Sequence, residues 1–151
     1  MKGWILTLLV AAVSLGFTAE FAQGQPGRND LDLRAHRINS MAFRSGSRGR
    51  ALRIVSDETG IPMRRLQDMD ARNPAAGPAG LMIASVLANN TRNAPEQFVN
   101  RHANGRSWTT MAVNNNVPIN RVNARLDRLE RSLNTLTPTG RPRPIGPPRW
   151  R

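Results

Sequence analysis

Any fold of this chain has to bury the segment "LMIASVLA", residues 81 to 88. The segment is apolar almost all round, and a helix of this composition is buried by its neighbours rather than exposed on one side. A strand is the alternative for so short an apolar run, but the alanines and the lack of strand patterns nearby favour a helix. We therefore expect this helix to form the centre of the domain, through Leu81, Ile83, Ala84, Val86 and Leu87.

Helix start and stop signals divide the chain before this segment. A first helix, with Asp30 as its N-cap, is expected to run to about residue 43. A second helix is expected over residues 48 to 59, and Gly60 follows it in the left-handed conformation that glycine tolerates. Pro62 suits the first position of a third helix, where a backbone N–H has no partner to lose.

The chain after the third helix continues the same pattern. The segment "AAGPAG", residues 75 to 80, is predicted to be a turn. Pro95, Ser107 and Pro118 then mark the starts of three further helices after the apolar one. The last of these helices carries a stripe of aliphatic residues at intervals of four, three, four and three, which is typical of a helix that packs along its length: Val122, Leu126, Leu129, Leu133 and Leu136.

A short internal echo indicates two similar helix pairs. With a shift of 56 residues, "GIPMRRL" at 60 to 66 lies over "NVPINRV" at 116 to 122. Each copy predicts a helix, a tight turn and a second helix. The sequence thus predicts an all-α domain over residues 48 to 136, in which two helix-turn-helix-like hairpins flank the buried apolar helix. An N-terminal helix and loop over residues 25 to 47 precede it.

Both ends of the chain are predicted to lie outside this domain. A signal peptide is indicated by the charge of Lys2, by the 14 mostly apolar residues from Trp4 to Phe17, and by the small residues Ala22 and Gly24 before the expected cut. We expect residues 1 to 24 to be removed near Gly24 and the protein to be periplasmic or secreted. An uncleaved membrane anchor is the alternative, although a span takes about 20 apolar residues. Residues 137 to 151 hold five prolines, four arginines and no acid, which predicts a disordered tail.

Composition limits the chemistry of the exported part. It has no cysteine, so no disulfide supports it and its hydrophobic core has to do so. It keeps 21 arginines against nine acids, a net charge of +12. Such a balance attracts polyanions, so the expected partner is an anionic polymer or membrane surface, or a protein. The candidate polyanion-binding residues are Arg121, Arg125, Arg128, Arg141, Arg143, Arg149, Trp150 and Arg151.

Residues 107 to 131 resemble the helix-turn-helix of sigma-factor region four and related bacterial regulators. The likeness rests on Ser107-Trp108, Met111-Ala112, the turn "NNNVP" and the helix "INRVNARLDRL". It implies that the second helix enters a DNA groove, with asparagine and arginine reading base edges. The base-reading candidates in this alternative are Asn120, Arg121, Asn123 and Arg125. Nucleic acid is then the partner, and the N-terminus is not a cleaved signal.

A longer stretch, residues 51 to 136, resembles a group of small exported bacterial proteins. The likeness rests on "RIVSDETGIPMRRLQ", "GLMIASVLANNT" and "GRSWTTMAVNNNVPINRVNARL". It implies an all-helical secreted domain and carries no assigned activity. This sequence departs from the group at residues 91 to 93, where the group has a glycine and a lysine.

Candidate catalytic groups are sparse. His36 and His102 lie 66 residues apart, and neither has a histidine or carboxylate at the spacing that a helical metal site uses. The acid pairs Asp57-Glu58 and Asp68/Asp70 are crowded by arginines, which favours ion pairs over acid–base work. No glycine-rich phosphate loop is present. We therefore expect a non-enzymatic interaction module with no catalytic residue, no metal and no cofactor.

Overall fold

The fold is all-α. The structure, a computed structural model, describes residues 30–135, and all regular elements in that range are helices, as predicted. The predicted signal peptide of residues 1 to 24 and the tail of residues 137 to 151 lie outside the described residues. The helices are α1 (Leu31–Arg44), α2 (Arg48–Thr59), α3 (Met63–Arg72), α4 (Gly77–Thr91), α5 (Pro95–Ala103), α6 (Trp108–Asn114) and α7 (Ile119–Thr135).

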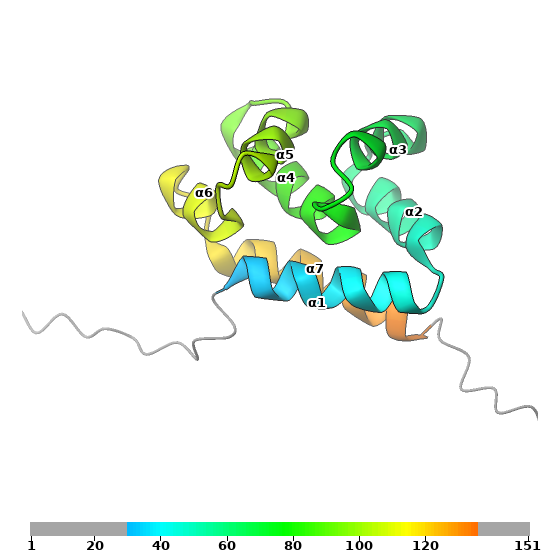
Figure 1. Ribbon diagram of the computed structural model, residues 1–151. Helices are drawn as coiled ribbons and strands as arrows, with labels where there is room; N and C mark the ends of the chain where they lie inside the picture. Colours follow the sequence, from blue (N-terminus) through cyan, green and yellow to red (C-terminus); the bar gives the residue numbers. More distant parts are fainter. Residues whose placement is uncertain (1–29, 136–151) are drawn as a thin grey trace, which may run out of the picture.

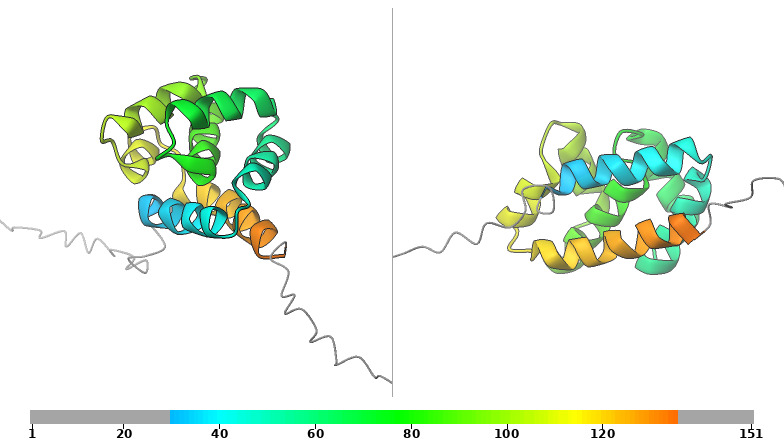
Figure 2. Two further views of the ribbon diagram at one scale, coloured as in Figure 1. Left: turned by 45° about the vertical axis from the view of Figure 1, so that its right-hand side comes forward. Right: turned by 90° about the horizontal axis from the view of Figure 1, so that it is seen from below.

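Helix α4 forms the centre of the molecule. It contacts all six other helices, and every residue from Gly77 to Ala88 is buried. Helices α1 and α7 lie side by side along one side of it, and α2, α3, α5 and α6 pack around the rest (Figures 1 and 2). The apolar segment at residues 81 to 88 is therefore the helix at the core, as its composition predicts.

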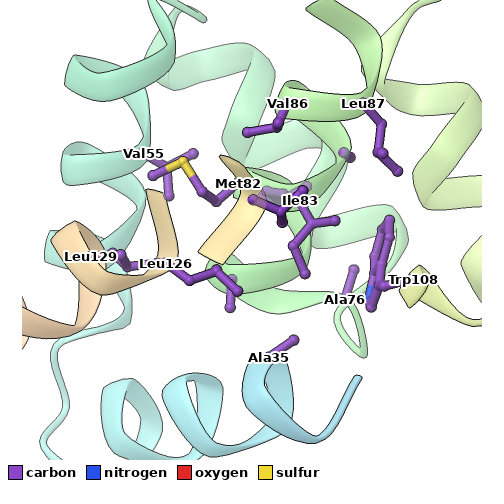
Figure 3. Close-up of a cluster of buried hydrophobic side chains, with 14 of the residues drawn as sticks. Ala35, Val55, Ala76, Met82, Ile83, Val86, Leu87, Trp108, Leu126 and Leu129 are labelled. Carbon is purple, nitrogen blue, oxygen red and sulfur yellow. The ribbon is translucent and has the colours of Figure 1, made fainter. Parts of the chain in front are cut away.

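The core is mainly aliphatic. Met82 and Ile83 of α4 meet Val55 of α2 and Leu126 of α7, and all four are fully buried (Figure 3). Burying a side chain of this size stabilises a fold by about 1.5–3 kcal/mol. Two aromatic residues complete the core, Phe98 and Trp108, which are 0% and 1% exposed.

The start of α4 differs from the predicted turn at residues 75 to 80. Only the segment up to Ala76 is a turn, because Gly77 enters the helix with a left-handed φ of +58°. The cap comes from α1: Asn39 Nδ2 donates to the carbonyl of Ala76 at 2.7 Å, and Asn39 Oδ1 accepts from the N–H of Ala79 at 2.9 Å. A cap that arrives from another helix leaves no trace in the local sequence, so the turn prediction was wrong for residues 77 to 80.

The other predicted helix starts agree closely with the structure. The Asp30 side chain accepts from two N–H groups in the first turn of α1, and Ser107 Oγ accepts from the N–H of Thr110 in α6. Pro62 occupies the cap position rather than the first turn, so α3 begins one residue later than predicted. Pro118 likewise precedes α7, which begins at Ile119.

The internal echo has a counterpart in the backbone. Gly60 and Asn116, which coincide under the 56-residue shift, both have a left-handed φ, +71° and +53°. A helix starts three residues after each of them, at Met63 and at Ile119. Asparagine tolerates this conformation better than other non-glycine residues. The two segments thus share a turn, and their closer likeness to a helix-turn-helix stays a prediction.

A buried arginine joins α1 to α7. The side chain of Arg34 is 10% exposed and donates to Asn123 Oδ1 at 2.9 Å. It also forms ion pairs with Asp127 and, at 3.3 Å, with Glu130. A buried guanidinium is tolerated when several acceptors surround it, and here one side of α7 supplies them.

The N-termini of α1 and α6 cap each other. Asp32 of α1 accepts from the N–H groups of Trp108 at 2.9 Å and Thr109 at 3.3 Å. In return, Thr109 Oγ1 accepts from the N–H of Leu31 at 3.0 Å. The first N–H groups of a helix have no partner within it, so each helix satisfies donors of the other. A carboxylate is also favoured there by the helix dipole.

Arg92 at the end of α4 gives a stability prediction. It is the C-cap and has a φ of +58°, a conformation that suits glycine and strains a residue with a Cβ. Arg92→Gly is therefore expected to raise the free energy of unfolding by about 1 kcal/mol, as measured by urea denaturation. Arg92→Ala is the matched control, because it removes the guanidinium and keeps the strain. An equal gain from the alanine variant would contradict the backbone explanation.

Candidate functional site: an arginine face and a histidine groove

Three of the predicted polyanion-binding arginines lie on one side of α7. Arg121, Arg125 and Arg128 follow each other at intervals of four and three, which places them on the same face of a helix. Arg125 Nη1 donates to Glu58 Oε2 at 2.6 Å, and Arg128 Nη1 lies 3.3 Å from the same oxygen. Arg121 donates to the side-chain oxygen of Asn90. We call these three arginines the α7 arginine face.

A pocket of about 350 Å³ adjoins the α7 arginine face. Met82 and Val86 of α4 contribute apolar lining, and Glu58, Arg121 and Arg125 contribute charge. Two guanidinium groups, those of Arg125 and Arg128, therefore share a single carboxylate, and the third, of Arg121, lies beside the same recess. The positive charge in excess is available to an anion that enters from solvent.

The base-reading candidates do not gather on one exposed face. Asn120 is exposed, but Asn123 is half-buried and accepts from Arg34 of α1. Arg125 points to the other side of α7, toward Glu58 of α2. Arg121 donates to Asn90 of α4, so three of the four candidate side chains hold α7 against its neighbours. The tail candidates Arg141, Arg143, Arg149, Trp150 and Arg151 lie outside the described residues.

Exposed arginines also occur on most of the surface. Residues 30–135 contain sixteen arginines, of which five form ion pairs with carboxylates: Arg34, Arg48, Arg65, Arg125 and Arg128. The remaining eleven are exposed and occur on or beside α1, α2, α3, α4, α5 and α7. Positive charge therefore surrounds the domain, and on the α7 arginine face Arg121 and Arg125 line a pocket while Arg128 shares Glu58 with Arg125.

A larger groove, which the sequence did not predict, lies between α1, the turn before α4, and α5 and α6. Its volume is about 580 Å³, and it brings together His36 and His102, which are 66 residues apart in sequence. We call it the histidine groove. Its lining includes Asp32, His36, Ser40, Phe43, Arg44, Arg48, Pro74, Ala75, His102 and Trp108.

His102 is held in a fixed orientation in this groove. Its ring stacks on Trp108 with the ring centres 4.3 Å apart and the planes 23° apart. Its Nδ1 lies 3.0 Å from the carbonyl oxygen of Arg106 and 3.9 Å from Asp32 Oδ1. Because a carbonyl only accepts, Nδ1 carries the hydrogen, and Nε2 of the neutral ring is then the acceptor.

The other end of the histidine groove is defined by arginine and phenylalanine. Arg48 donates through Nε and Nη2 to both oxygens of Asp70, each at 2.8 Å. This side-chain hydrogen bonding raises the pKa of the Arg48 guanidinium, which stays positively charged. The negative charge of Asp70 balances it. Arg44 and Phe43 are exposed beside it, Phe43 at 74%. Arg44 is thus the accessible cation of this end.

A second pocket continues the groove. It has a volume of about 300 Å³ and shares Pro74, Ala75, Ala76 and His102 with the first. Arg72 lies in its wall. The two pockets therefore adjoin at the turn before α4 and at His102 of α5.

Within residues 30–135, no three metal-ligating side chains gather at one point. None of the helices in that range combines the length and the apolar character that crossing a membrane takes.

Comparisons with protein families, with curated proteins and with solved structures found no match for this chain.

Sequence reasoning missed the histidine groove for an identifiable reason. Its walls come from segments that are distant in the chain, and His36 and His102 each have the surroundings of an ordinary surface residue in sequence. One local signal was present: His102 and Trp108 flank the tight turn at Gly105, which brings two rings together. Nothing local places Asp32 against Trp108.

Proposed function

We propose that the protein is an exported, non-enzymatic helical module that binds anionic components of the cell envelope through its arginines. The observation that carries this proposal is the α7 arginine face, where Arg125 and Arg128 share the single carboxylate of Glu58, and Arg121 and Arg125 line a pocket. Arginine suits phosphate and carboxylate groups because its planar fork donates two parallel hydrogen bonds. The exposed arginines elsewhere add a long-range attraction.

Glu58 has a specific role in this proposal. Its Oε2 accepts from two of the three arginines, so it occupies the donors that an anionic ligand needs. Glu58 is therefore a competitor that any bound anion displaces. Asp57, the neighbouring acid in α2, is exposed and forms no ion pair within residues 30–135.

The pair of acids gives a sharp test with polyphosphate as the probe. Glu58→Gln is expected to bind long-chain polyphosphate about two- to fivefold more tightly than the unmodified protein, because Arg125 and Arg128 are released. Asp57→Asn changes the net charge by the same amount and leaves the arginines as they are. Binding is measured by titration calorimetry at several salt concentrations.

The control and the contradicting outcome follow from this pairing. If both acid variants gain equally, the attraction is a general effect of net charge and the α7 arginine face is not the site. The combined variant Arg121→Gln, Arg125→Gln, Arg128→Gln is expected to flatten the salt dependence more than removal of Arg37, Arg50 and Arg64. Vesicles of phosphatidylglycerol replace polyphosphate in a second series to separate a lipid surface from a polymer.

Double-stranded DNA in the same assay addresses the nucleic-acid alternative. Sequence-selective binding that is lost on Asn120→Ala would favour the helix-turn-helix reading instead. Export is a separate part of the proposal and rests on residues 1 to 24. Cell fractionation followed by mass spectrometry of the N-terminus determines whether those residues are removed.

A further inference from the structure

The end of the histidine groove at Arg44 has a charge that favours an anion. The carboxylate that lines the groove, Asp32, lies at the opposite end of α1 from Arg44 and accepts hydrogen bonds from the backbone N–H groups of Trp108 and Thr109. Arg48 is neutralised by Asp70, which leaves the exposed guanidinium of Arg44 as the permanent charge. The chain has a net charge of +12, so a second copy or its own arginine-rich tail would be repelled. The occupant that fits is a foreign anion.

The apolar part of the groove adds a flat surface beside this cation. Phe43 is 74% exposed and adjacent to Arg44 in α1, and Pro74 and Ala75 form part of the wall. An aromatic face attracts the positive edges of C–H groups. A ligand with an anionic group next to a C–H face therefore matches this end of the groove.

The uncharged polar groups of the groove distinguish a sugar from a hydrocarbon. The hydroxyl of Ser40 and the rings of His36 and His102 line the same recess. A hydroxyl and a neutral imidazole each donate and accept, which is also what sugar hydroxyls do. A hydrocarbon chain would remove water from these groups and offer them no hydrogen bond.

The length of the groove indicates more than one sugar unit. The wall formed by α1 extends from Asp32 to Arg44, about 18 Å at 1.5 Å per residue. The adjoining pocket that begins at His102 extends the recess further.

We propose that the histidine groove binds an acidic oligosaccharide, with a carboxylate at Arg44, a ring face on Phe43 and hydroxyls at Ser40, His36 and His102. This site shares no residue with the pocket at the α7 arginine face. The inference is independent of polyphosphate binding, so each of the two proposals can fail without the other.

The test uses trigalacturonate as the probe and the full exported chain as the protein. Arg44→Gln is expected to weaken binding about tenfold in titration calorimetry, because it removes a charge-assisted hydrogen bond. Phe43→Ala is expected to weaken it about fivefold. Both side chains are exposed, so neither variant disturbs the core, and circular dichroism checks this. Arg131→Gln, which changes an exposed arginine on α7, is the matched control and is expected to bind normally.

Three outcomes would overturn this assignment. Equal binding of the methyl-esterified trisaccharide would remove the carboxylate from the argument, and equal binding of triglutamate would show that the ligand is an acidic peptide or any small polyanion. Unchanged affinity in both Arg44→Gln and Phe43→Ala would place the ligand elsewhere. The variant of the α7 arginine face is expected to keep its affinity for trigalacturonate even where it loses polyphosphate.

Discussion

Gly77→Ala is expected to lower the free energy of unfolding by about 3 kcal/mol. Two effects combine at this position. The residue has a φ of +58°, which strains any side chain, and an added Cβ would lie 2.6–2.7 Å from the side-chain atoms of Asn39. Asn39 would have to move and give up its hydrogen bonds to Ala76 and Ala79. Urea denaturation followed by circular dichroism measures the loss.

Gly60→Ala is the matched control for this prediction. Gly60 has a similar φ of +71°, but no atom lies within 4 Å of the position that a Cβ would take. The conformational strain is shared by the two variants, so Gly60→Ala is expected to cost about 1 kcal/mol. Equal losses at the two positions would mean that contact with Asn39 contributes nothing.

Trp108→Ala is expected to lower the free energy of unfolding by about 4 kcal/mol. The side chain is 1% exposed and fills the space between α4 and the ring of His102. Its Cζ2 atom lies 3.0 Å from where a Cβ on Gly80 would be, so the packing on α4 is close. Thermal and urea denaturation measure the effect.

Trp108→Phe and Phe98→Leu test whether the loss in the free energy of unfolding depends on the volume of the side chain removed or on its position in the core. Each keeps a large apolar group in the core, so each is expected to lose about 1–2 kcal/mol. A loss of less than about 1 kcal/mol in Trp108→Ala would show that the surroundings collapse onto the vacant space, and that Trp108 is not the anchor of α6.

Much of the fold was predictable because local patterns and tertiary packing agree in this chain. The aliphatic stripe of α7 is buried through Leu133, and the caps at Asp30 and Ser107 form as expected. Where local pattern and tertiary packing disagree, the local residues carry no sign of it. The helix at Gly77 begins inside a predicted turn because Asn39 reaches it from 38 positions upstream, and no window of local sequence contains both.

The candidate sites were predictable only where local spacing determines them and not where tertiary packing does. The spacing of Arg121, Arg125 and Arg128 places them on one face of α7 without any tertiary information. Their sharing of Glu58, and the engagement of Asn123 by Arg34, depend on which helices pack against α7. The histidine groove depends on tertiary packing altogether, because α1 and α5 meet only in the folded chain.

The pairing of Arg34 with Asp127 and Glu130 has a consequence for the order in which the molecule assembles. These partners are 93 and 96 residues apart. A chain that emerges from a ribosome, or from a secretion channel, with its N-terminus first presents α1 long before α7 exists beside it. Helix α7 therefore has to emerge before α1 can form these ion pairs. During N-to-C-terminal emergence the contact between α1 and α7 stays open until most of α7 is available.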